Sequence, residues 1–445
     1  MGVALLVGGL GFVAKLLHMA KDLVVAGRFG TSGDLDAFIL AMSFPLFTIS
    51  TLAGSLNSSV VPVYVQVRSE AGEPAAHRLI GNVLAMTLPL LLVATGLLAA
   101  TGTVGFLRIG TTARVGEGMR TELLFLALLP VVLLSGLSTL WASTLNASER
   151  FVAAALAPVS VSLVPVVALL VLRRLRPLDA LLLGTLIGYG VETLVLAVSA
   201  RRASLPVLPR WSGIDDGTRR VLRAYLPMVA GALISSSSPL VDQLMATRLG
   251  TGSVASLAYG NKVISFTLSI GLLALGTAVL PQFSRMAASN DWPAIRHTLT
   301  TYSKLVLVFS VPPTLVAMYF ARPIIGLLFE RGAFGAGDTR LIGLVFAAYL
   351  PQVPFALLGL LGVRLLSAMQ QNRMIMLIAC TNVVINFVGD YVLMGWFGLP
   401  GIALSTSIVS ASATTAVFVV IWVLLRQKER ADTTSSPPPT SIPAG

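Results

Sequence analysis

Long apolar stretches separated by short polar connections run along almost the whole chain. A membrane core about 30 Å thick is crossed by a helix of roughly 20 apolar residues. The pattern therefore predicts an all-α polytopic membrane protein with about twelve transmembrane helices. The expected helices cover residues 4–26, 36–66, 79–103, 121–146, 151–173, 178–200, 221–247, 254–283, 297–320, 339–369, 372–394 and 400–425.

The second half of the chain repeats features of the first half at an offset of about 220 residues. "DLVVAGRFGTSG" (22–33) matches "DQLMATRLGTGS" (242–253), and "LLPVVLLSGLSTLWASTLNA" (128–147) matches "YLPQVPFALLGLLGVRLLSA" (349–368). Six helices per half give both halves the same orientation in the membrane. Parallel repeats of this kind are common in secondary transporters, where two bundles rock around a central site.

The repeat divides the chain into two six-helix lobes around a central cavity. A scaffold without transport is the alternative, but polar residues gather where a cavity is expected, which favours a transporter. We expect four regions: an N-lobe over 1–200, a cytoplasmic loop over 201–220, a C-lobe over 221–425 and a disordered cytoplasmic tail over 426–445.

Charge is scarce and lies mostly between the apolar stretches. The chain is 55% hydrophobic and 11% charged, with a formal net charge of +12, whereas soluble domains carry about 25% charged residues. Because Lys and Arg concentrate in short loops, the excess is read as membrane topology and not as nucleic-acid binding. The loops on the side of the N-terminus hold about 15 Lys and Arg against about 11 opposite, which predicts cytoplasmic N- and C-termini.

The first expected helix carries a polar stripe. On a helix, Lys15, His18 and Asp22 fall within about 60° of one another, and Lys21 widens the arc to about 120°. Each ionised group facing lipid costs about 2.5–3.5 kcal/mol, so we expect the stripe to face a water-filled cavity. The alternatives are snorkelling of Lys21 and Asp22 to the headgroups and a packing or hydrogen-bonding role for His18.

The second half supplies a counterpart to this stripe. Asn261 and Lys262 stand near the start of the eighth expected helix, and Asp242 lies in the seventh. A cavity lined by Lys15, Lys21 and Lys262 suits an anionic ligand, since a lysine ammonium binds phosphate as a point charge. In this interpretation Asp22 and Asp36 pair with the lysines.

Catalytic and metal-binding patterns are missing from the sequence. No zinc signature, Walker loop, nucleophile elbow or kinase set occurs, and Cys380 is the only cysteine. We therefore expect no enzyme, no metal and no cofactor. Transport without a nucleotide site would draw on the membrane potential, on an ion gradient or on consumption of the product.

Three segments resemble one family of bacterial flippases. "AKDLVVAGRFGTSGDLDAF" (20–38), "AYGNKVISFTLSIGLLALGTAVLPQFSR" (258–285) and "PIIGLLFERGAFGAGDT" (323–339) are similar to segments of the MviN/MurJ lipid II flippases. That family belongs to the multidrug/oligosaccharidyl-lipid/polysaccharide exporter superfamily. The resemblance implies two lobes around a cationic cavity in the bacterial inner membrane, with the family's cavity cations at Lys15, Lys21 and Lys262 and its acidic partners at Asp22 and Asp36.

The chain departs from the family pattern at several positions. All three cations are lysine where the family typically has arginine, which removes the bidentate fork on a diphosphate. A further arginine is replaced near Ile49, and an acidic residue one turn after Lys262 is replaced by Ser265. The family usually has fourteen helices, and twelve are expected here.

The loop "FERGAF" offers a possible gate at the outer opening, formed by Glu330 and Arg331. The alternative is a tight turn with an ion pair between these two residues, a bend at Gly332 and Asp338 as the N-cap of the next helix.

The resemblance implies a flippase that carries a polyprenyl-diphosphate-linked sugar from the inner to the outer leaflet by alternating access. The sugar lipid would be lipid II or a related lipid-linked oligosaccharide, for peptidoglycan or surface polysaccharide synthesis. The expected partners are this lipid, the bilayer and cell-envelope synthesis enzymes. The alternatives are a multidrug-type exporter and a non-transporting scaffold for envelope enzymes.

Overall fold

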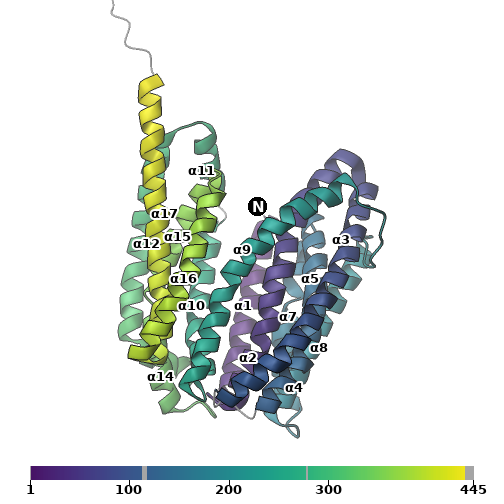
Figure 1. The fold of residues 1–445 in the computed structure, drawn as a ribbon, viewed down its shortest axis with the longest axis vertical. Coiled ribbons are helices and arrows are strands. Elements are labelled where there is room, and N and C mark those ends of the chain that lie inside the picture. Colours follow the sequence, from purple (N-terminus) through teal and green to yellow (C-terminus); the bar gives the residue numbers. More distant parts are fainter. Residues whose placement is uncertain (1, 113–117, 277–278, 436–445) are drawn as a thin grey trace, which may run out of the picture. The chain divides into compact units, whose positions relative to one another are not determined.

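The structure is a computed structural model that describes residues 2–112, 118–276 and 279–435. Over these residues the secondary structure is helical, with no strand, which confirms the predicted all-α class (Figure 1). The chain packs as two compact units. The first unit consists of Met1–Tyr259 with Arg322–Gly343, and the second of Gly260–Ala321 with Leu344–Gly445.

The predicted membrane spans coincide with helices. Within the described residues, nine helical stretches are long and apolar enough to cross a membrane. One of them, Gly33–Gly102, is 70 residues long and holds two predicted spans, because its helix bends at Gly72. The predicted spans 4–26 and 254–283 fall outside the nine stretches but on further helices.

The helices of the first unit follow in chain order. They are α1 (Gly2–Phe29), α2 (Gly33–Thr48), the π-helical turn η1 (Ile49–Ala53), α3 (Gly54–Thr112), α4 (Gly118–Leu128), α5 (Pro130–Ala147), α6 (Phe151–Leu156), α7 (Val159–Val171), α8 (Pro177–Arg202), α9 (Asp216–Ala246), η2 (Thr247–Leu249), the start of α10 (Ser253–Gly276), most of α13 (Ala321–Phe329) and the start of α14 (Ala336–Tyr349).

The second unit holds the rest of α10 and α14 and five further helices. These are α11 (Val279–Ala288), α12 (Trp292–Tyr319), α15 (Gln352–Ala368), α16 (Asn372–Phe397) and α17 (Leu399–Ser435).

Prolines and aspartates explain where several helices begin. α5 starts at Pro130, because proline fits the first turn, where no N–H is needed. Its repeat counterpart α15 starts directly after Pro351. The Asp215 carboxylate accepts a 2.7 Å hydrogen bond from the N–H of Thr218 and caps α9. Asp291 caps α12 in the same way, through the N–H of Ala294.

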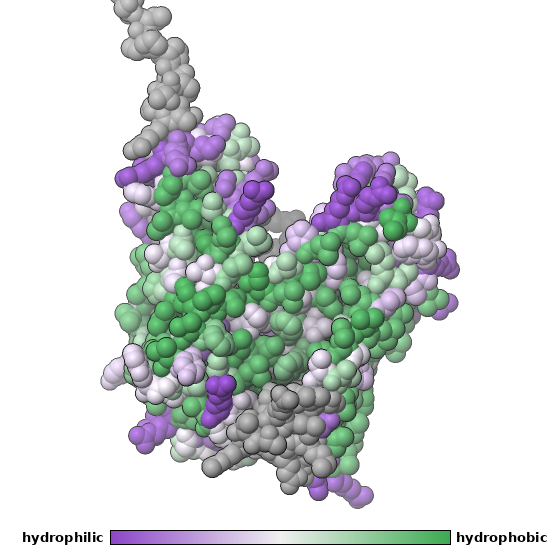
Figure 2. All heavy atoms as spheres, in the orientation of Figure 1, coloured by the Kyte–Doolittle hydropathy of each residue, from purple (hydrophilic) through white to green (hydrophobic). Residues whose placement is uncertain are grey.

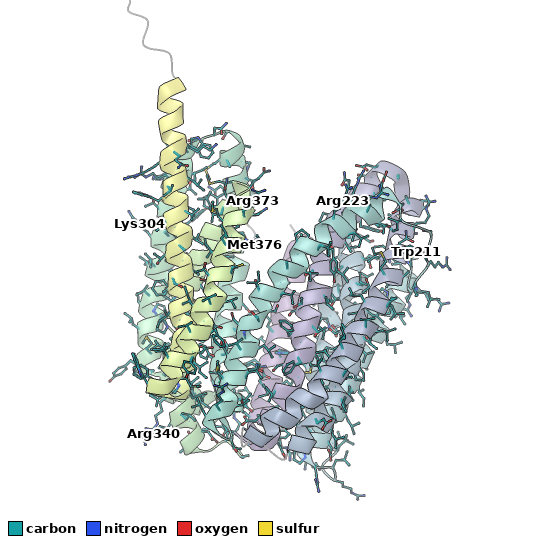
Figure 3. All side chains as sticks on the ribbon, viewed as in Figure 1. Trp211, Arg223, Lys304, Arg340, Arg373 and Met376 are labelled. Atoms are coloured by element: carbon teal, nitrogen blue, oxygen red, sulfur yellow. The ribbon has the colours of Figure 1, made fainter. Side chains whose placement is uncertain are left out.

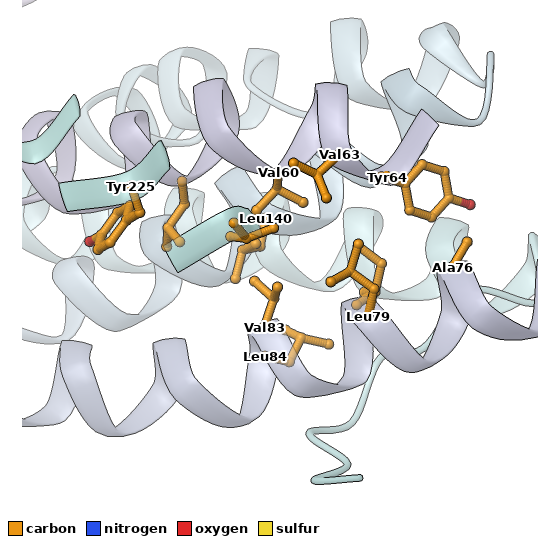
Figure 4. Close-up of a cluster of buried hydrophobic side chains, with 12 residues drawn as sticks. Val60, Val63, Tyr64, Ala76, Leu79, Val83, Leu84, Leu140 and Tyr225 are labelled. Carbon is orange, nitrogen blue, oxygen red and sulfur yellow. The ribbon is translucent and has the colours of Figure 1, made fainter. Parts of the chain in front are cut away.

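The bend at Gly72 divides α3 into a first arm (residues 54–71) and a second arm (residues 73–112). These two arms form the core of the first unit together with α5 and α9. Leu79, Ile80 and Leu84 of the second arm lie against Val60 and Tyr64 of the first (Figure 4). Leu140 from α5 and Tyr225 from α9 complete the cluster. Contact with both arms of α3 places α9 in the first unit. The predicted lobe boundary between 200 and 221 follows the sequence repeat and stays a prediction.

The second unit has its own core, where α12 and α17 pack against α15. Its fully buried members include Phe283, Ile295, Leu361, Leu365 and Leu366. Outside the core, large apolar side chains are exposed, among them Phe309 at 74% and Trp396 at 75%. Hydrophobic residues cover the middle of the helices, and hydrophilic residues gather towards their ends (Figure 2). That distribution is the one a lipid-facing surface requires.

The C-terminal segment differs from the prediction. α17 continues to Ser435, so the expected disordered tail over 426–445 is wrong for residues 426–435. The residues after the predicted span 400–425, "RQKER", are good helix formers, so the helix continues past that span. Residues 436–445 lie outside the described part of the chain.

One buried side chain anchors the central loop between α8 and α9. Asn82 of α3 is fully buried. Its amide donates to the carbonyl oxygen of Gly213 at 2.8 Å and to Thr218 Oγ1 at 3.2 Å. The N–H and hydroxyl of Ser212 donate to its Oδ1 at 2.8 and 2.9 Å. Trp211 lies on the same loop with its ring exposed (Figure 3).

We expect Asn82→Leu to release this loop. Each buried polar group left unpaired costs about 1–3 kcal/mol, so trypsin should cleave after Arg210 at least about tenfold faster. Cleavage is followed by gel electrophoresis of the membrane-embedded protein. Asn57→Leu, at an exposed position of the same helix, is the control. Equal cleavage rates in the Asn82 variant and the unaltered protein would show that the loop is held elsewhere.

Candidate functional site

The predicted polar stripe of α1 runs from an exposed to a buried environment. Lys15 and His18 are exposed, Lys21 is half-buried and Asp22 is buried. α1 packs on α6 and α7, and His18 Nδ1 lies 2.9 Å from the Ser162 hydroxyl of α7. His18 therefore makes the kind of hydrogen bond that the alternative interpretation assigned to it.

Lys21 and Asp22 form an ion pair inside the first unit. Lys21 Nζ lies 3.8 Å from Asp22 Oδ1, and the two side chains are 17% and 9% exposed. Because both are largely removed from water, each charge offsets part of the cost of burying the other. This is the pairing predicted for Asp22. Its repeat counterpart, Asp242 of α9, is also buried, at 8% exposure.

Asp36 has a different role from the predicted one. Its carboxylate is fully buried and accepts hydrogen bonds from the N–H of Gly252 at 2.5 Å and of Ala255 at 2.7 Å. Gly252 directly precedes α10 and Ala255 lies in its first turn. At this end of a helix, N–H groups without a partner inside the helix favour a negative charge. The carboxylate of α2 therefore holds the N-terminus of α10, and its hydrogen-bond partners within the described residues are these backbone N–H groups and not a lysine.

Three loops of the first unit meet at the ends of these helices. We call the contact of residues 27–32, 250–255 and 330–338 the loop junction. Thr31 Oγ1 donates to Asp338 Oδ1 at 2.5 Å, and the N–H of Ala333 donates to the carbonyl oxygen of Gly27 at 2.8 Å. The loop junction joins the two matching segments of the sequence repeat to the "FERGAF" loop.

Glycine is needed where the loops approach most closely. Gly332 has φ +62°, and a Cβ there would overlap the carbonyl oxygen of Gly27. The predicted bend at Gly332 is therefore present. Beside it, the Tyr259 ring lies 5.3 Å from Phe329 and 5.7 Å from Phe334 between centroids. These aromatic contacts pack the start of α10 against the loop.

Two details of the predicted turn are wrong. Glu330 and Arg331 do not pair with each other among the described contacts: Thr339 donates to Glu330 Oε2 at 2.7 Å, and Arg331 donates to the carbonyl oxygens of Leu327 and Leu328. Each side chain satisfies a nearby helix end instead. Asp338 is also not the N-cap. It lies in the first turn of α14, and its Oδ2 accepts from the N–H of Gly335 at 3.0 Å.

The remaining predicted site residues belong to the second unit. Asn261 and Lys262 lie in α10 and are half-buried, and Asn261 Oδ1 is 3.4 Å from the Ser265 hydroxyl. Convergence of Lys262 with Lys15 and Lys21 on one cavity stays a prediction.

Two buried polar residues of α16 were missed from the sequence. Asn386 and Asp390 lie one turn apart in α16, at 1% and 0% exposure, and the Ser405 hydroxyl of α17 donates to the Asn386 carbonyl oxygen at 3.3 Å. The signal was available, because a carboxylate inside an apolar membrane helix points to function. Within the described residues, no group of three or more His, Cys, Asp and Glu side chains is arranged to hold a metal ion.

Comparisons with known proteins cover nearly the whole chain. A family model described as "Lipid II flippase MurJ" matches residues 25–436. The lipid II flippase MurJ of Burkholderia cenocepacia is 24% identical, over 91% of this chain and 80% of that protein. The probable lipid II flippase MurJ of Synechocystis is 27% identical, over 93% and 79%.

Solved structures share the fold. A lipid II flippase MurJ in an inward closed conformation has a TM-score of 0.79 at 21% identity, and covers 94% of this chain and 87% of its own. An inward-facing multidrug resistance MATE transporter of the MOP superfamily has a TM-score of 0.78 at 15% identity, with coverages of 95% and 96%. The family is one of membrane transporters, and the chain is a multi-pass membrane protein. The match over residues 25–436 confirms the resemblance seen in the sequence: this chain belongs to the MurJ family of lipid II flippases.

Proposed function

We propose that this chain moves lipid II from the inner to the outer leaflet of the bacterial cytoplasmic membrane for peptidoglycan synthesis. The observation that carries the proposal is a largely buried cation, Lys21, beside Asp22 in the first membrane helix of a chain from a flippase family. Burying such a charge is costly. A diphosphate headgroup that must enter the membrane region gives a reason to keep it.

In the proposed cycle, Lys15, Lys21 and Lys262 bind the diphosphate while the polyprenyl chain stays in lipid. Lysine contributes point charges without the planar fork of arginine, so it fits a diphosphate without selecting the attached sugar. A lipid-linked oligosaccharide for surface polysaccharide is therefore a second candidate substrate.

In alternating access, each end of the transport cavity must close and reopen. The loop junction joins segments from both halves of the repeat through a few hydrogen bonds at Thr31 and Ala333, and Asp36 of α2 binds its residues 252 and 255 from outside. Such a small set of contacts is suited to break and re-form during a cycle. Glu330 and Arg331 lie in this junction, so the predicted gate is placed there as part of the proposal.

The drive is proposed to come from the membrane potential or an ion gradient. A potential acts on charge at about 2.3 kcal/mol per elementary charge per 100 mV. An inside-negative potential favours the outward movement of an anionic headgroup, which is the direction of transport proposed here. For ion coupling, the buried Asp390 is the candidate carboxylate.

The two alternatives predict different behaviour. A multidrug-type exporter shares the fold and would transport cationic drugs. A scaffold for envelope enzymes would transport nothing and would depend on its surface loops.

The test is made in bacteria depleted of their own lipid II flippase. If the proposal holds, expression of this chain restores growth and makes lipid II accessible to a lipid II-cleaving enzyme added outside the cytoplasmic membrane. Growth without this accessibility would indicate a scaffold. Resistance to cationic drugs without either effect would indicate an exporter.

A further inference from the structure

A groove with a basic mouth runs between α12 and α17 of the second unit. Its outer part has a volume of about 280 Å³ and is lined by both helices. Arg296 and Lys304 of α12 and Arg426 of α17 are its cations, and all three are exposed. Figure 3 labels Lys304 on α12. Leu299 and Ile421 are among the apolar side chains of the wall.

The groove continues into an apolar part of about 610 Å³. Ser303, Leu307, Phe418 and Trp422 line both parts, so the two are continuous. In the continuation, α15 contributes Phe355 and Leu358 to the wall. The groove is therefore amphipathic along its length, with cations at one end and an apolar channel beyond them.

The mouth lies at the edge of the membrane. Arg426 is two residues from the end of the apolar stretch Leu399–Lys428, and its guanidinium carbon lies 3.7 Å above the Trp422 ring. Tryptophan and arginine in this position mark the boundary between hydrocarbon and headgroups. The buried Ser303 hydroxyl in the wall has no hydrogen-bond partner among the described residues, so it is available as a donor.

We propose that this groove binds one anionic phospholipid of the surrounding bilayer. The phosphate lies among Arg296, Lys304 and Arg426, and an acyl chain lies along Phe418 and Trp422. Three cations complement a negatively charged headgroup, whereas the positive amine of a zwitterionic lipid would be repelled. The predicted substrate lysines are not among the lining residues, so the occupant is a bilayer lipid and not the transported one.

Lipid binding is measured by native mass spectrometry of the purified chain titrated with phosphatidylglycerol or with phosphatidylcholine of the same acyl chains. We expect one phosphatidylglycerol to bind more tightly than the rest. Arg296→Ala, Lys304→Ala and Arg426→Ala should each weaken it about fivefold, the effect of one cation near a membrane surface. Arg373→Ala, an exposed cation of the same unit outside the groove, should leave it unchanged.

A second variant tests the channel without changing charge. Leu307→Trp places an indole in the apolar part and should also weaken phosphatidylglycerol binding. The proposal is overturned if the triple alanine variant, still monodisperse and with an unchanged melting temperature, binds phosphatidylglycerol as tightly as the unaltered chain. Phosphatidylcholine binding as tightly as phosphatidylglycerol would also overturn the proposal, because the groove would then be unselective. Displacement of phosphatidylglycerol by undecaprenyl diphosphate at equal concentration would overturn it too, because the groove would then be part of the transport path.

Discussion

Asp36→Ala should open the loop junction and slow transport at least about tenfold. The substitution removes the acceptor of two N–H groups at the start of α10 in a fully buried position. The loss of a helix cap costs about 0.5–2 kcal/mol, and each buried donor left unpaired costs about 1–3 kcal/mol. Hydrogen exchange at the amides of residues 250–256 should therefore accelerate by about 100-fold, and lipid II flipping should fall with it.

Two variants control this prediction. Asp36→Asn keeps one carbonyl acceptor and should give an intermediate effect on exchange. Asp34→Ala, two residues earlier and exposed, should change neither exchange nor transport. Unchanged exchange at residues 250–256 in Asp36→Ala would mean that the start of α10 is held by other contacts, such as those of Tyr259.

Lys21→Ala should lower flipping of lipid II by about 10- to 100-fold. A hydrogen bond to a charged group contributes about 1.5–3 kcal/mol, and this cation is proposed to bind the diphosphate. Lys21→Arg should retain transport, because it keeps the charge and adds a bidentate fork. The measurement is the initial flipping rate in vesicles at equal amounts of folded protein. Arg340→Ala, an exposed cation of the same unit, should leave the rate unaltered.

Folding and transport are separated by a double variant. Lys21→Ala leaves Asp22 buried without the lysine beside it, so the loss of rate has two possible origins. Lys21→Ala with Asp22→Asn removes both charges and should restore the melting temperature without restoring transport. Recovery of transport in the double variant would rule out a direct role of Lys21 in binding the headgroup.

Hydropathy was sufficient for the helices because each predicted span exceeds the length that a bilayer requires. The repeat was also readable, since Asp22 and Asp242 lie in matching segments and both are buried. The end of α17 was missed because the prediction stopped at the apolar stretch, although "RQKER" favours helix in water as well. Hydropathy therefore predicts where the membrane helices lie, whereas the residue at which a helix ends also depends on the helix propensity of the polar residues that follow.

The contacts of the site depended on which loops meet. Asp36 was predicted to pair with a lysine, but its partners lie 216 and 219 residues away in sequence. Asn82 reaches the central loop across 130 or more residues. No local pattern contains these distances. Asp338 shows the opposite problem, because the local pattern indicated a nearby helix start but made Asp338 the N-cap, whereas α14 already begins at Ala336 and Asp338 lies in its first turn.

The central claim is that lysines of this chain carry the diphosphate headgroup of a lipid across the membrane. It is tested most directly with purified protein in vesicles containing lipid II, by measuring how fast the lipid in one leaflet becomes accessible from the other. We predict rapid exchange with the unaltered chain and exchange close to that of protein-free vesicles when Lys15, Lys21 and Lys262 are all replaced by alanine. Equal exchange by the unaltered chain and a folded triple variant would contradict the account.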